Sequence, residues 1–505
     1  MRYSFFAFIF LSCIQLGTTQ NIDRTHPSFP FAHQSLETFK TFLALPNDAH
    51  YPEQIEQNVA WCSEKLTEKN FTTQRLVTAG APLLLATYNK QVDQQPTLLL
   101  YIHIDGQPVD SDFWFQDNPY EATLKQSVEG EGWVKMDWSK LSSDELKPDW
   151  RIFARSASDD KAPFVMLLTA LETLNSQKKT LPYNLKVILD FEEEIGSPNL
   201  ATAVVKYKED LAADMLIIFD GPKHLSNEPT IAFGARGITA MTIKVFGPTY
   251  SLHSGHYGNY APNPALRLAE LLNSMKDEHG RVTIKGYYDG IELDNKTKAI
   301  LAAVPDDEQQ LRLKLGIGAI DSVGSNYQES IQYPSLNIRG MSSGWIGKEV
   351  RTIVPASATA ELDLRLVVES DGTRLKQLVR QHIADQGYYI LDRKPTARER
   401  VQYAKICQID DSRGVTKAFR TDFDSKLGKW VFNTIEQTFG KAPIRVRTMG
   451  GTLPTSPFIT TLGVPAVIVP LANSDNNQHS PNENLRLGNY FDGVKTIYSL
   501  LNSPF

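Results

Sequence analysis

Cysteine, positive charge and long apolar runs are all scarce in this sequence. Three cysteines in 505 residues are too few for a disulfide framework. The 52 Lys and Arg residues are outnumbered by 58 Asp and Glu, and a net charge of −6 lacks the basic excess of a nucleic-acid-binding protein. No repeat of 20–50 residues is visible, and no apolar stretch reaches the roughly 20 residues of a transmembrane helix. What remains is a globular chain with 41% hydrophobic residues, enough for a sizeable core.

The first 20 residues predict a secretory signal rather than a part of the fold. Arg2 precedes an apolar run at residues 5–11, and Gly17 and Thr19 supply the small residues of a cleavage site. Lipoprotein processing and anchoring at Cys13 is an alternative that the pattern leaves open. We therefore expect an exported protein, either periplasmic or secreted.

Two cysteines would remain after such a cleavage. Cys62 and Cys407 could pair in an oxidising compartment, or each could be a buried free thiol, since cysteine is often simply buried. The sequence leaves both interpretations open.

Four apolar runs end in residues that can bind metal ions. Residues 97–102, 185–189, 215–219 and 464–469 are typical of buried parallel strands. Open α/β sheets bind their ligands at the carboxyl ends of such strands. The polar residues that follow the four runs are His103 and Asp105, then Glu192, Glu193 and Glu194, then Asp220, and finally His479 and Glu483.

A fifth candidate stands at the start of a predicted helix. Asp159 lies shortly before an apolar run with helical rhythm that begins at Pro163. The N-terminus of a helix favours anionic side chains. Any one of these residues alone is better explained as a cap or a turn residue, but five at the ends of strands or helices together indicate a site.

Imidazole and carboxylate ligands without thiolates favour zinc, with cobalt or manganese as possible substitutes. Two histidines and three carboxylates could give each of two metals a histidine, a terminal carboxylate and a share of a bridging aspartate. Such a pair would acidify a bridging water and polarise a substrate carbonyl. Asp105 is placed to accept the second ring proton of His103, and one of the adjacent Glu193 and Glu194 can bind metal while the other acts as the base.

This ordered set resembles the co-catalytic di-zinc metallopeptidases and deacylases. They include carnosine-type dipeptidase, glutamate carboxypeptidase, aminoacylase, acetylornithine deacetylase and succinyl-diaminopimelate desuccinylase. The similarity extends from about residue 103 to the C-terminus, and residues 103–108, 159–161 and 193–197 match its motifs. It implies two Zn²⁺ per subunit and a catalytic pair, Glu193 and Asp105. The metal ligands that it implies are His103, Asp159 as the bridge, Glu194, Asp220 and His479.

The resemblance also implies the fold, an α/β zinc-exopeptidase catalytic domain with an inserted α+β lid and dimerisation domain. We place the catalytic domain at residues 21–236 and 396–505 and the inserted domain at 237–395. The inserted segment begins with a strand-like stretch at 238–245 and alternates as a strand does at 361–366. A homodimer through the inserted domain is a possible assembly.

Four further residues match substrate-binding positions of the family. His253 matches a histidine that reaches the partner's active site in dimeric members and stabilises the oxyanion. Arg365 matches an arginine that binds the substrate carboxylate, and Gly451 and Thr452 match the glycine-rich substrate loop. The alternatives are a surface turn for His253 and an ion pair within a strand for Arg365.

The sequence departs from the family pattern on both sides of Asp159 and in one insertion. Residues 154–156 are Ala-Arg-Ser where Gly-Arg-Gly is usual, and Ala162 replaces a glycine. An insertion between residues 119 and 151 carries Trp133, Trp138 and Trp150, which could edge the substrate pocket or pack on the surface. The metal ligands are unaffected, so these differences bear on the substrate.

These residues predict a di-zinc hydrolase that cleaves an amide bond near a free carboxylate, through a metal-bridging water that Glu193 activates. We expect an exopeptidase of the dipeptidase or carboxypeptidase type, acting on a small peptide or an N-acyl amino acid. The alternatives are an N-acyl-amino-acid deacylase and a non-catalytic binding protein on the same fold. A serine-hydrolase pattern at residues 340–344 is followed by a glycine where a helix should start, which argues against a nucleophile elbow.

Overall fold

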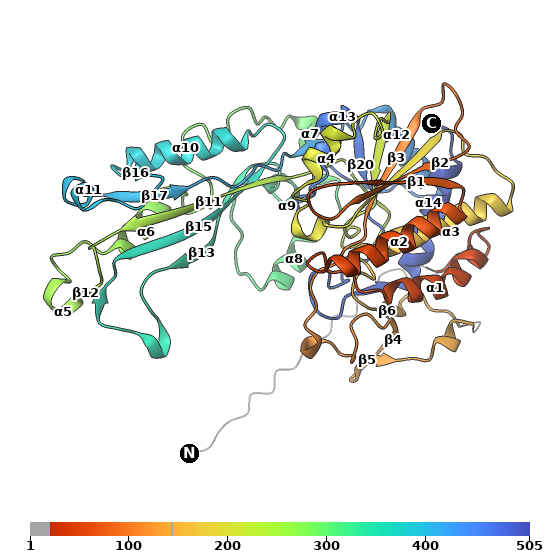
Figure 1. Cartoon of the computed structure of the whole chain (residues 1–505), viewed down its shortest axis with the longest axis horizontal. Coiled ribbons are helices and arrows are strands. Elements are labelled where there is room, and N and C mark those ends of the chain that lie inside the picture. Colours follow the sequence, from red (N-terminus) through yellow and green to blue (C-terminus); the bar gives the residue numbers. More distant parts are fainter. Residues whose placement is uncertain (1–20, 143–144) are drawn as a thin grey trace, which may run out of the picture.

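The computed structural model describes residues 21–142 and 145–505. It shows an elongated molecule of two lobes, each built on its own β-sheet (Figure 1). The residues of the predicted secretory signal, Cys13 among them, lie outside the described part of the chain. Within that part, no helix combines the length and the apolar character that a membrane crossing requires.

The larger lobe is built on an eight-stranded sheet. Its central strands β7, β3, β8 and β20 are parallel, so their carboxyl ends lie at one edge. The strands, in sheet order, are β1 (Phe71–Leu76), β2 (Leu83–Tyr88), β7 (Asn184–Asp190), β3 (Thr97–His103), β8 (Met215–Ile218), β20 (Ala466–Ile468), β9 (Thr230–Ala232) and β19 (Ile444–Val446).

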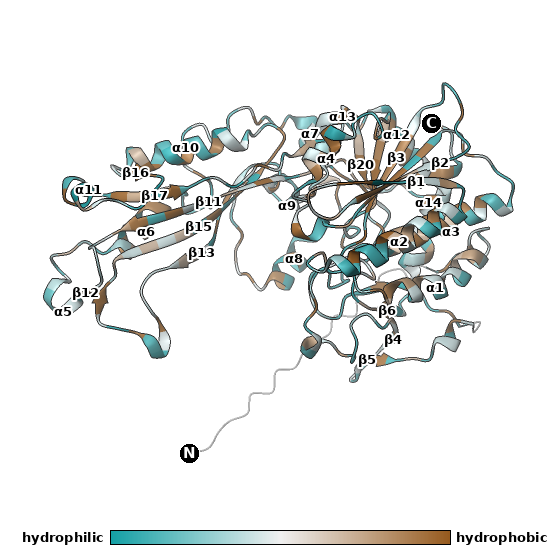
Figure 2. Ribbon diagram, viewed as in Figure 1, coloured by the Kyte–Doolittle hydropathy of each residue, from teal (hydrophilic) through white to brown (hydrophobic). Residues whose placement is uncertain are grey.

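Helices cover both faces of this sheet because its central strands are apolar on both sides. In β3, Leu98 and Leu100 belong to one core cluster, whereas Leu99 and Tyr101 belong to another on the opposite face. Figure 2 shows the resulting concentration of hydrophobic residues on these strands. The first face packs on α1 (Phe29–Leu43), α2 (Pro52–Glu68), α3 (Lys161–Ser176), α12 (Lys426–Phe439) and α14 (Leu487–Asn502), and the second on α4 (Leu200–Lys206) and α13 (Ser456–Leu462).

The smaller lobe is a five-stranded, mainly antiparallel sheet with helices packed on it. In α10, Leu375, Val379 and Ile383 recur every fourth residue and form the buried stripe. The strands, in sheet order, are β13 (Ser335–Ser342), β15 (Ser357–Leu366), β11 (Gly237–Phe246), β17 (Ile406–Asp410) and β16 (Tyr389–Leu391), and the packed helices are α6 (Pro264–Asn273) and α10 (Gly372–Asp385).

Short elements complete the two lobes. The inserted region also contains β12 (Leu252–His253), α5 (Ser254–Tyr257), α7 (Asn295–Ala302), α8 (Glu308–Leu315), α9 (Tyr327–Ser330), η4 (Gly347–Glu349), β14 (Ile353–Val354) and α11 (Ala397–Gln402). The other lobe adds η1 (Ser111–Phe113), η2 (Trp138–Ser142) and η3 (Glu193–Ile195), and β10 (Gly234–Ala235) pairs with β18 (Phe419–Arg420) where the chain passes between the lobes.

The predicted end of the inserted domain at residue 395 is too early. The strand β17 lies beyond that position and pairs with β11, with Ile406 opposite Phe246 and Asp410 opposite Thr242. The chain therefore leaves the five-stranded sheet only after Asp410. The predicted start, residue 237, is where β11 begins.

The insertion between residues 119 and 151 supplies two strands, β4 (Thr123–Val128) and β5 (Gly132–Lys135), of a separate four-stranded sheet. The other two strands of this sheet are β6 (Arg151–Phe153) and β21 (Asn484–Arg486). Trp133 stacks under Arg151 at 4.6 Å, Lys40 lies 4.8 Å above Trp138, and Trp150 is buried. These contacts favour the packing interpretation of the insertion over a role at the pocket edge.

Both described cysteines are free and buried. Cys62 lies on α2 in the core of the larger lobe, and Cys407 lies on β17 in the core of the smaller one. The interpretation as two buried thiols therefore holds, because the two side chains belong to separate cores.

Candidate metal centre

All five residues that were predicted as metal ligands lie together at the carboxyl edge of the larger sheet. His103 ends β3, Asp220 follows β8 by two residues, and Glu194 lies on η3 after β7. Asp159 precedes α3, and His479 lies in the loop between β20 and β21. They form two groups, each able to hold a metal ion, and Asp159 belongs to both: His103, Asp159 and Asp220 in one, and Asp159, Glu194 and His479 in the other.

The two oxygens of Asp159 face different groups. His103 Nε2 donates to Asp159 Oδ1 at 2.9 Å and lies 4.0 Å from Asp220 Oδ1. His479 Nε2 lies 3.2 Å from Asp159 Oδ2 and 3.3 Å from Glu194 Oε2. One carboxylate thus stands between two histidine–carboxylate pairs, which is the arrangement of a ligand that bridges two cations.

Asp105 holds the loop that carries the two glutamates. Its Oδ1 accepts the backbone N–H of Glu193 at 3.0 Å and its Oδ2 that of Glu194 at 2.9 Å. Its contact with His103 Nδ1, at 3.6 Å, is too long for a hydrogen bond. The structure therefore shows Asp105 fixing the glutamate loop, whereas the sequence pattern predicted that it would orient His103.

A buried carboxylate that sequence reasoning assigned no role, Glu483, fixes the segment before Asp159. Its two oxygens accept the backbone N–H groups of Ser156, Ser158 and Asp159 at 2.8–3.0 Å, and the hydroxyl of Ser158 at 2.9 Å. Arg155 Nη1 donates to it at 2.8 Å, and neither side chain is more than 3% exposed. In the sequence, Glu483 could be recognised only as a carboxylate near His479, because the residues that it binds lie more than 300 positions away.

The charges of the site act strongly on one another. Burial, reinforced by the Asp159 carboxylate, raises the pKa of Asp220 to about 6 and that of Glu194 to about 8. The hydrogen bond to Asp159 raises the pKa of His479 to about 9. Burial opposes ionisation of Asp159 too, but its hydrogen bonds from His103 and His479 outweigh burial and hold its pKa below the usual range.

Glu193 has the properties of a base that is not a ligand. It lies beside Glu194 on η3 but belongs to neither metal-binding group. Burial, with smaller contributions from the Asp220 and Asp105 carboxylates, raises its pKa well above the usual range. A carboxylate of raised pKa can take up a proton near neutral pH.

The donor set fits divalent cations. Asp159, Asp220 and Glu194 bring three carboxylates together, and within the described ranges the ion pairs of all three are with histidine, not with lysine or arginine. His103 Nδ1 is buried without a hydrogen-bond partner. Clustered buried carboxylates need compensating positive charge, and nitrogen and oxygen donors in this combination suit zinc.

Two of the predicted substrate residues are in contact across the lobes. Arg365 Nη1, on β15, donates to Thr452 Oγ1 at 2.7 Å. The neighbouring Gly451 accepts the backbone N–H of Arg236 at 3.1 Å through its carbonyl. Arg365 lies 3.9 Å from Asp363, so its main partner is the loop of the other lobe.

His253 is not near the metal groups of its own chain. It ends β12, caps the short helix α5 by accepting the N–H of Gly255 at 3.0 Å, and is exposed. Figure 1 shows β12 and α5 at the end of the smaller lobe farthest from the larger sheet.

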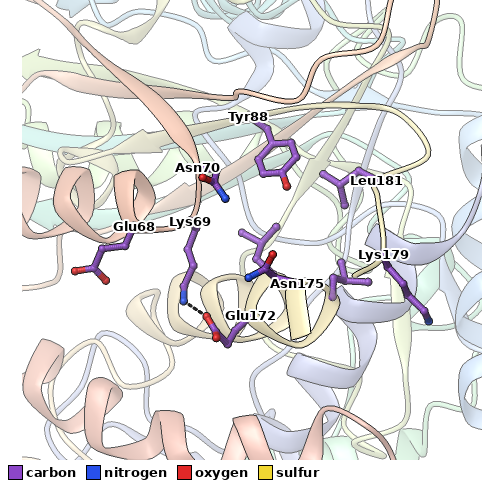
Figure 3. Close-up of a pocket in the computed structure, with 10 residues that line it drawn as sticks. Glu68, Lys69, Asn70, Tyr88, Glu172, Asn175, Lys179 and Leu181 are labelled. Carbon is purple, nitrogen blue, oxygen red and sulfur yellow. Dashed lines mark hydrogen bonds and ion pairs between the residues drawn. The ribbon is translucent and has the colours of Figure 1, made fainter. Parts of the chain in front are cut away.

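A separate pocket lies between α2, β2 and α3 (Figure 3). Lys69 and Glu172 form an ion pair across it, and Tyr88 and Asn70 line it. Glu172 is eleven residues into α3 from Lys161, or about 16 Å along the helix axis. This pocket contains none of the predicted site residues.

Comparison with known proteins places these residues in a family. The model of peptidase family M20/M25/M40 matches residues 99–503. Cys-Gly metallodipeptidase DUG1 of Candida albicans is 26% identical over 434 residues, covering 82% of this chain and 80% of the relative. The human Beta-Ala-His dipeptidase is 25% identical over 431 residues, covering 82% and 76%.

Solved structures share the fold over almost the whole chain. The M20 metallo-carboxypeptidase Sso-CP2 from Sulfolobus solfataricus has a TM-score of 0.75 and 27% identity, covering 93% of this chain and 99% of that one. Human carnosine dipeptidase 1 has a TM-score of 0.71 and 22% identity, covering 94% and 96%. The predicted catalytic domain with an inserted second domain is confirmed by this likeness.

The comparisons overturn the prediction of export. The matching Cys-Gly metallodipeptidases of yeasts are cytosolic enzymes. That prediction rested on a short apolar run and two small residues near the N-terminus, a pattern of low specificity.

The family match covers most of the chain and spans every residue of both metal-binding groups. Two ligand groups that share one aspartate are what a dinuclear metal site requires. The chain therefore belongs to peptidase family M20/M25/M40, whose members are dinuclear metallopeptidases that hydrolyse peptide bonds.

Proposed function

We propose that this protein is a zinc-dependent exopeptidase of the dipeptidase type. The observation that carries the proposal is the position of Asp159 between two histidine–carboxylate groups, with Glu193 beside them. The names of its relatives, Cys-Gly and Beta-Ala-His dipeptidases, support a dipeptide substrate.

In this proposal two zinc ions occupy the two groups. His103 and Asp220 would hold one, Glu194 and His479 would hold the other, and Asp159 belongs to both groups. When bound, such a pair lowers the pKa of a water and polarises the scissile carbonyl.

Glu193 then acts as the base and acid. Its carboxylate takes a proton from the attacking water and returns it to the leaving amine, so that one residue serves both proton transfers. The hydrogen bonds from the Glu193 and Glu194 N–H groups to Asp105 keep this carboxylate next to the metal groups. Asp105 is therefore a positioning residue in this mechanism.

The contact between Arg365 and Thr452 supports a carboxylate-binding role for this pair. A guanidinium held by a neutral hydroxyl keeps further donors for the planar oxygens of a carboxylate. The carbonyl of Gly451, which accepts the backbone N–H of Arg236 at 3.1 Å, ties this loop to the chain near the start of the smaller lobe. Recognition of a free carboxylate would restrict the enzyme to the chain end of a short peptide.

His253 would serve a second subunit. It is far from the metal groups of its own chain, and a homodimer through the smaller lobe would bring it to the partner's site. Large apolar side chains exposed on that lobe support such an interface, among them Tyr260 and Ile346, each 88% exposed, and Val350 at 69%.

The proposal is tested by coupling metal analysis to activity. We expect about two zinc ions per chain and release of an amino acid from dipeptides that a chelator abolishes. Activity confined to N-acyl amino acids would instead identify a deacylase, and no activity with zinc bound would identify a binding protein.

Replacing Glu193 by Gln should lower kcat about 10²–10⁴-fold while the zinc content stays unchanged, because the base is lost and the ligands remain. Glu131→Gln, on the exposed turn between β4 and β5, is the matched control and should leave kcat unchanged. Full activity of the Glu193→Gln enzyme would refute the proposed mechanism.

A further inference from the structure

A cavity of about 250 Å³ lies beside the metal centre, between the two lobes. One wall comes from the larger lobe, next to Asp220, and from the loop that leads to Thr452. The other comes from the segment of the inserted domain that contains α8 and α9. Neither the metal ligands nor the catalytic glutamate line it.

The cavity is close to both ends of the proposed substrate site. Pro222 lines it and is two residues from Asp220, and Gly450 lines it and is two residues from Thr452. Two residues span at most about 7 Å. A Cβ on Gly221 would be 3.0 Å from the Met449 methyl group, so Met449, which lines the cavity, also lies against the metal-site turn.

The interior of the cavity is suited to an uncharged side chain. Ala232, Leu311, Ile331 and Val446 contribute apolar surface to it. Two of the ionisable side chains in its wall are paired with each other: His224 Nε2 lies 2.9 Å from Asp306 Oδ1, and Gln328 donates to Asp306 Oδ2 at 2.8 Å.

Lys223 also lines the cavity, and its ammonium group has no hydrogen-bond partner. The charges that act on it are those of Asp492 and Lys441, and neither residue lines the cavity. Because that nitrogen is itself shielded from solvent, the open cavity meets another part of Lys223 and not its charged end.

We propose that this cavity binds the side chain of the amino-terminal residue of the substrate and accepts a large apolar side chain, such as that of leucine, methionine or phenylalanine. The inference rests on the proposed function. If the carboxylate of the second residue is bound by Arg365 and Thr452 and the scissile carbonyl faces the metal groups, the first side chain emerges next to Asp220 and Pro222. The apolar lining makes the binding free energy more favourable for each methylene that the cavity buries and less favourable for a charged side chain.

The test uses the zinc-loaded full chain and the dipeptides Leu-Gly, Phe-Gly, Ala-Gly and Asp-Gly. We expect kcat/KM for Leu-Gly and Phe-Gly to exceed that for Ala-Gly at least tenfold, the scale on which hydrophobic pockets discriminate methylenes, and Asp-Gly to be poorest. Equal rates for Leu-Gly and Ala-Gly would overturn the pocket and leave the peptidase intact. No hydrolysis of any dipeptide would refute the proposed function itself.

A second experiment uses variants in which a larger side chain fills the cavity. Leu311→Trp should reduce the Leu-Gly to Ala-Gly ratio of kcat/KM at least tenfold, because the indole occupies the space of the substrate side chain. Leu313→Trp, on the same helix and 73% exposed, is the matched control and should leave the ratio unchanged. Leu225→Trp, at another point of the wall, replaces Leu311→Trp if that variant does not fold. A ratio that neither cavity variant changes would overturn the inference.

Discussion

Replacing Glu483 by Gln is expected to lower the free energy of unfolding by more than the loss of a surface ion pair would. Its carboxylate is fully buried and accepts five donors: three backbone N–H groups, the Ser158 hydroxyl and Arg155. An amide in its place presents one oxygen and turns an NH₂ group toward donors that it cannot satisfy. Arg155, 3% exposed, would be left as a buried charge without its partner.

Breaking a buried ion pair from one side costs about 3–5 kcal/mol, and we expect a loss of that size in the free energy of unfolding. The assay is urea unfolding of the chelated protein, so that metal binding does not contribute. Glu56→Gln provides the control, because Glu56 and Arg75 form a bidentate pair at 2.5–2.6 Å that is about half exposed and should contribute less than about 1 kcal/mol.

The Glu483 variant should also bind zinc more weakly, because the Asp159 backbone loses the acceptor that fixes it. A destabilisation no larger than that of Glu56→Gln, with unchanged zinc affinity, would show that the segment before Asp159 is held by other contacts. That result would refute the reasoning.

Two further predictions concern the same lobe. Arg151 and Arg486 together outweigh burial at Asp475 and hold its pKa below the usual range, so its charge stabilises the fold above about pH 4 and that stability is lost as the pH falls. Asp475→Asn should therefore lower the urea midpoint at pH 7 by an amount equivalent to at most about 1 kcal/mol, since half the side chain is exposed. The difference between the variant and the unmodified protein should be smaller at pH 3. The same difference at both pH values would contradict this prediction. Gly106→Ala would place a Cβ 2.1 Å from Ser156 Oγ and should cost about 1–3 kcal/mol in thermal unfolding. Ser156→Gly should relieve this, since Ser156 has a φ of 61°, and no relief would point to another contact.

The positions of the metal groups could be predicted because they follow from strand ends. Parallel apolar strands align their carboxyl ends at one edge, so His103 and Asp220 were expected at the same edge, and the structure adds that β3 and β8 are neighbours there. The resemblance to a family added which carboxylate stands between the groups. The first inference uses residues that directly follow an apolar run, and the second uses Asp159, which stands shortly before one.

What could not be predicted depends on contacts between distant parts of the chain. Glu483 lies in a polar loop and carries no periodic signal, so its hold on residues 155–159 appears only in three dimensions. The 3.6 Å separation of Asp105 and His103 could not be read from strand alternation, which gives a face and not a distance. The strand β17 was missed because five residues after a short helix give too little alternation.

The position of β20 has a consequence for the order in which the molecule is made. This strand lies between β8 and β9, which are near neighbours in the sequence, yet more than two hundred residues separate β9 from β20. During synthesis the whole inserted domain emerges while β8 and β9 still lack the strand between them, and two strand edges stay open to wrong pairing. The strand that closes this gap is followed by His479 and Glu483, so a shortened chain lacks both the second metal group and the acceptor that fixes Asp159. The whole metal centre can therefore form only after β20 has joined the sheet, because the loop that follows this strand carries His479 and Glu483.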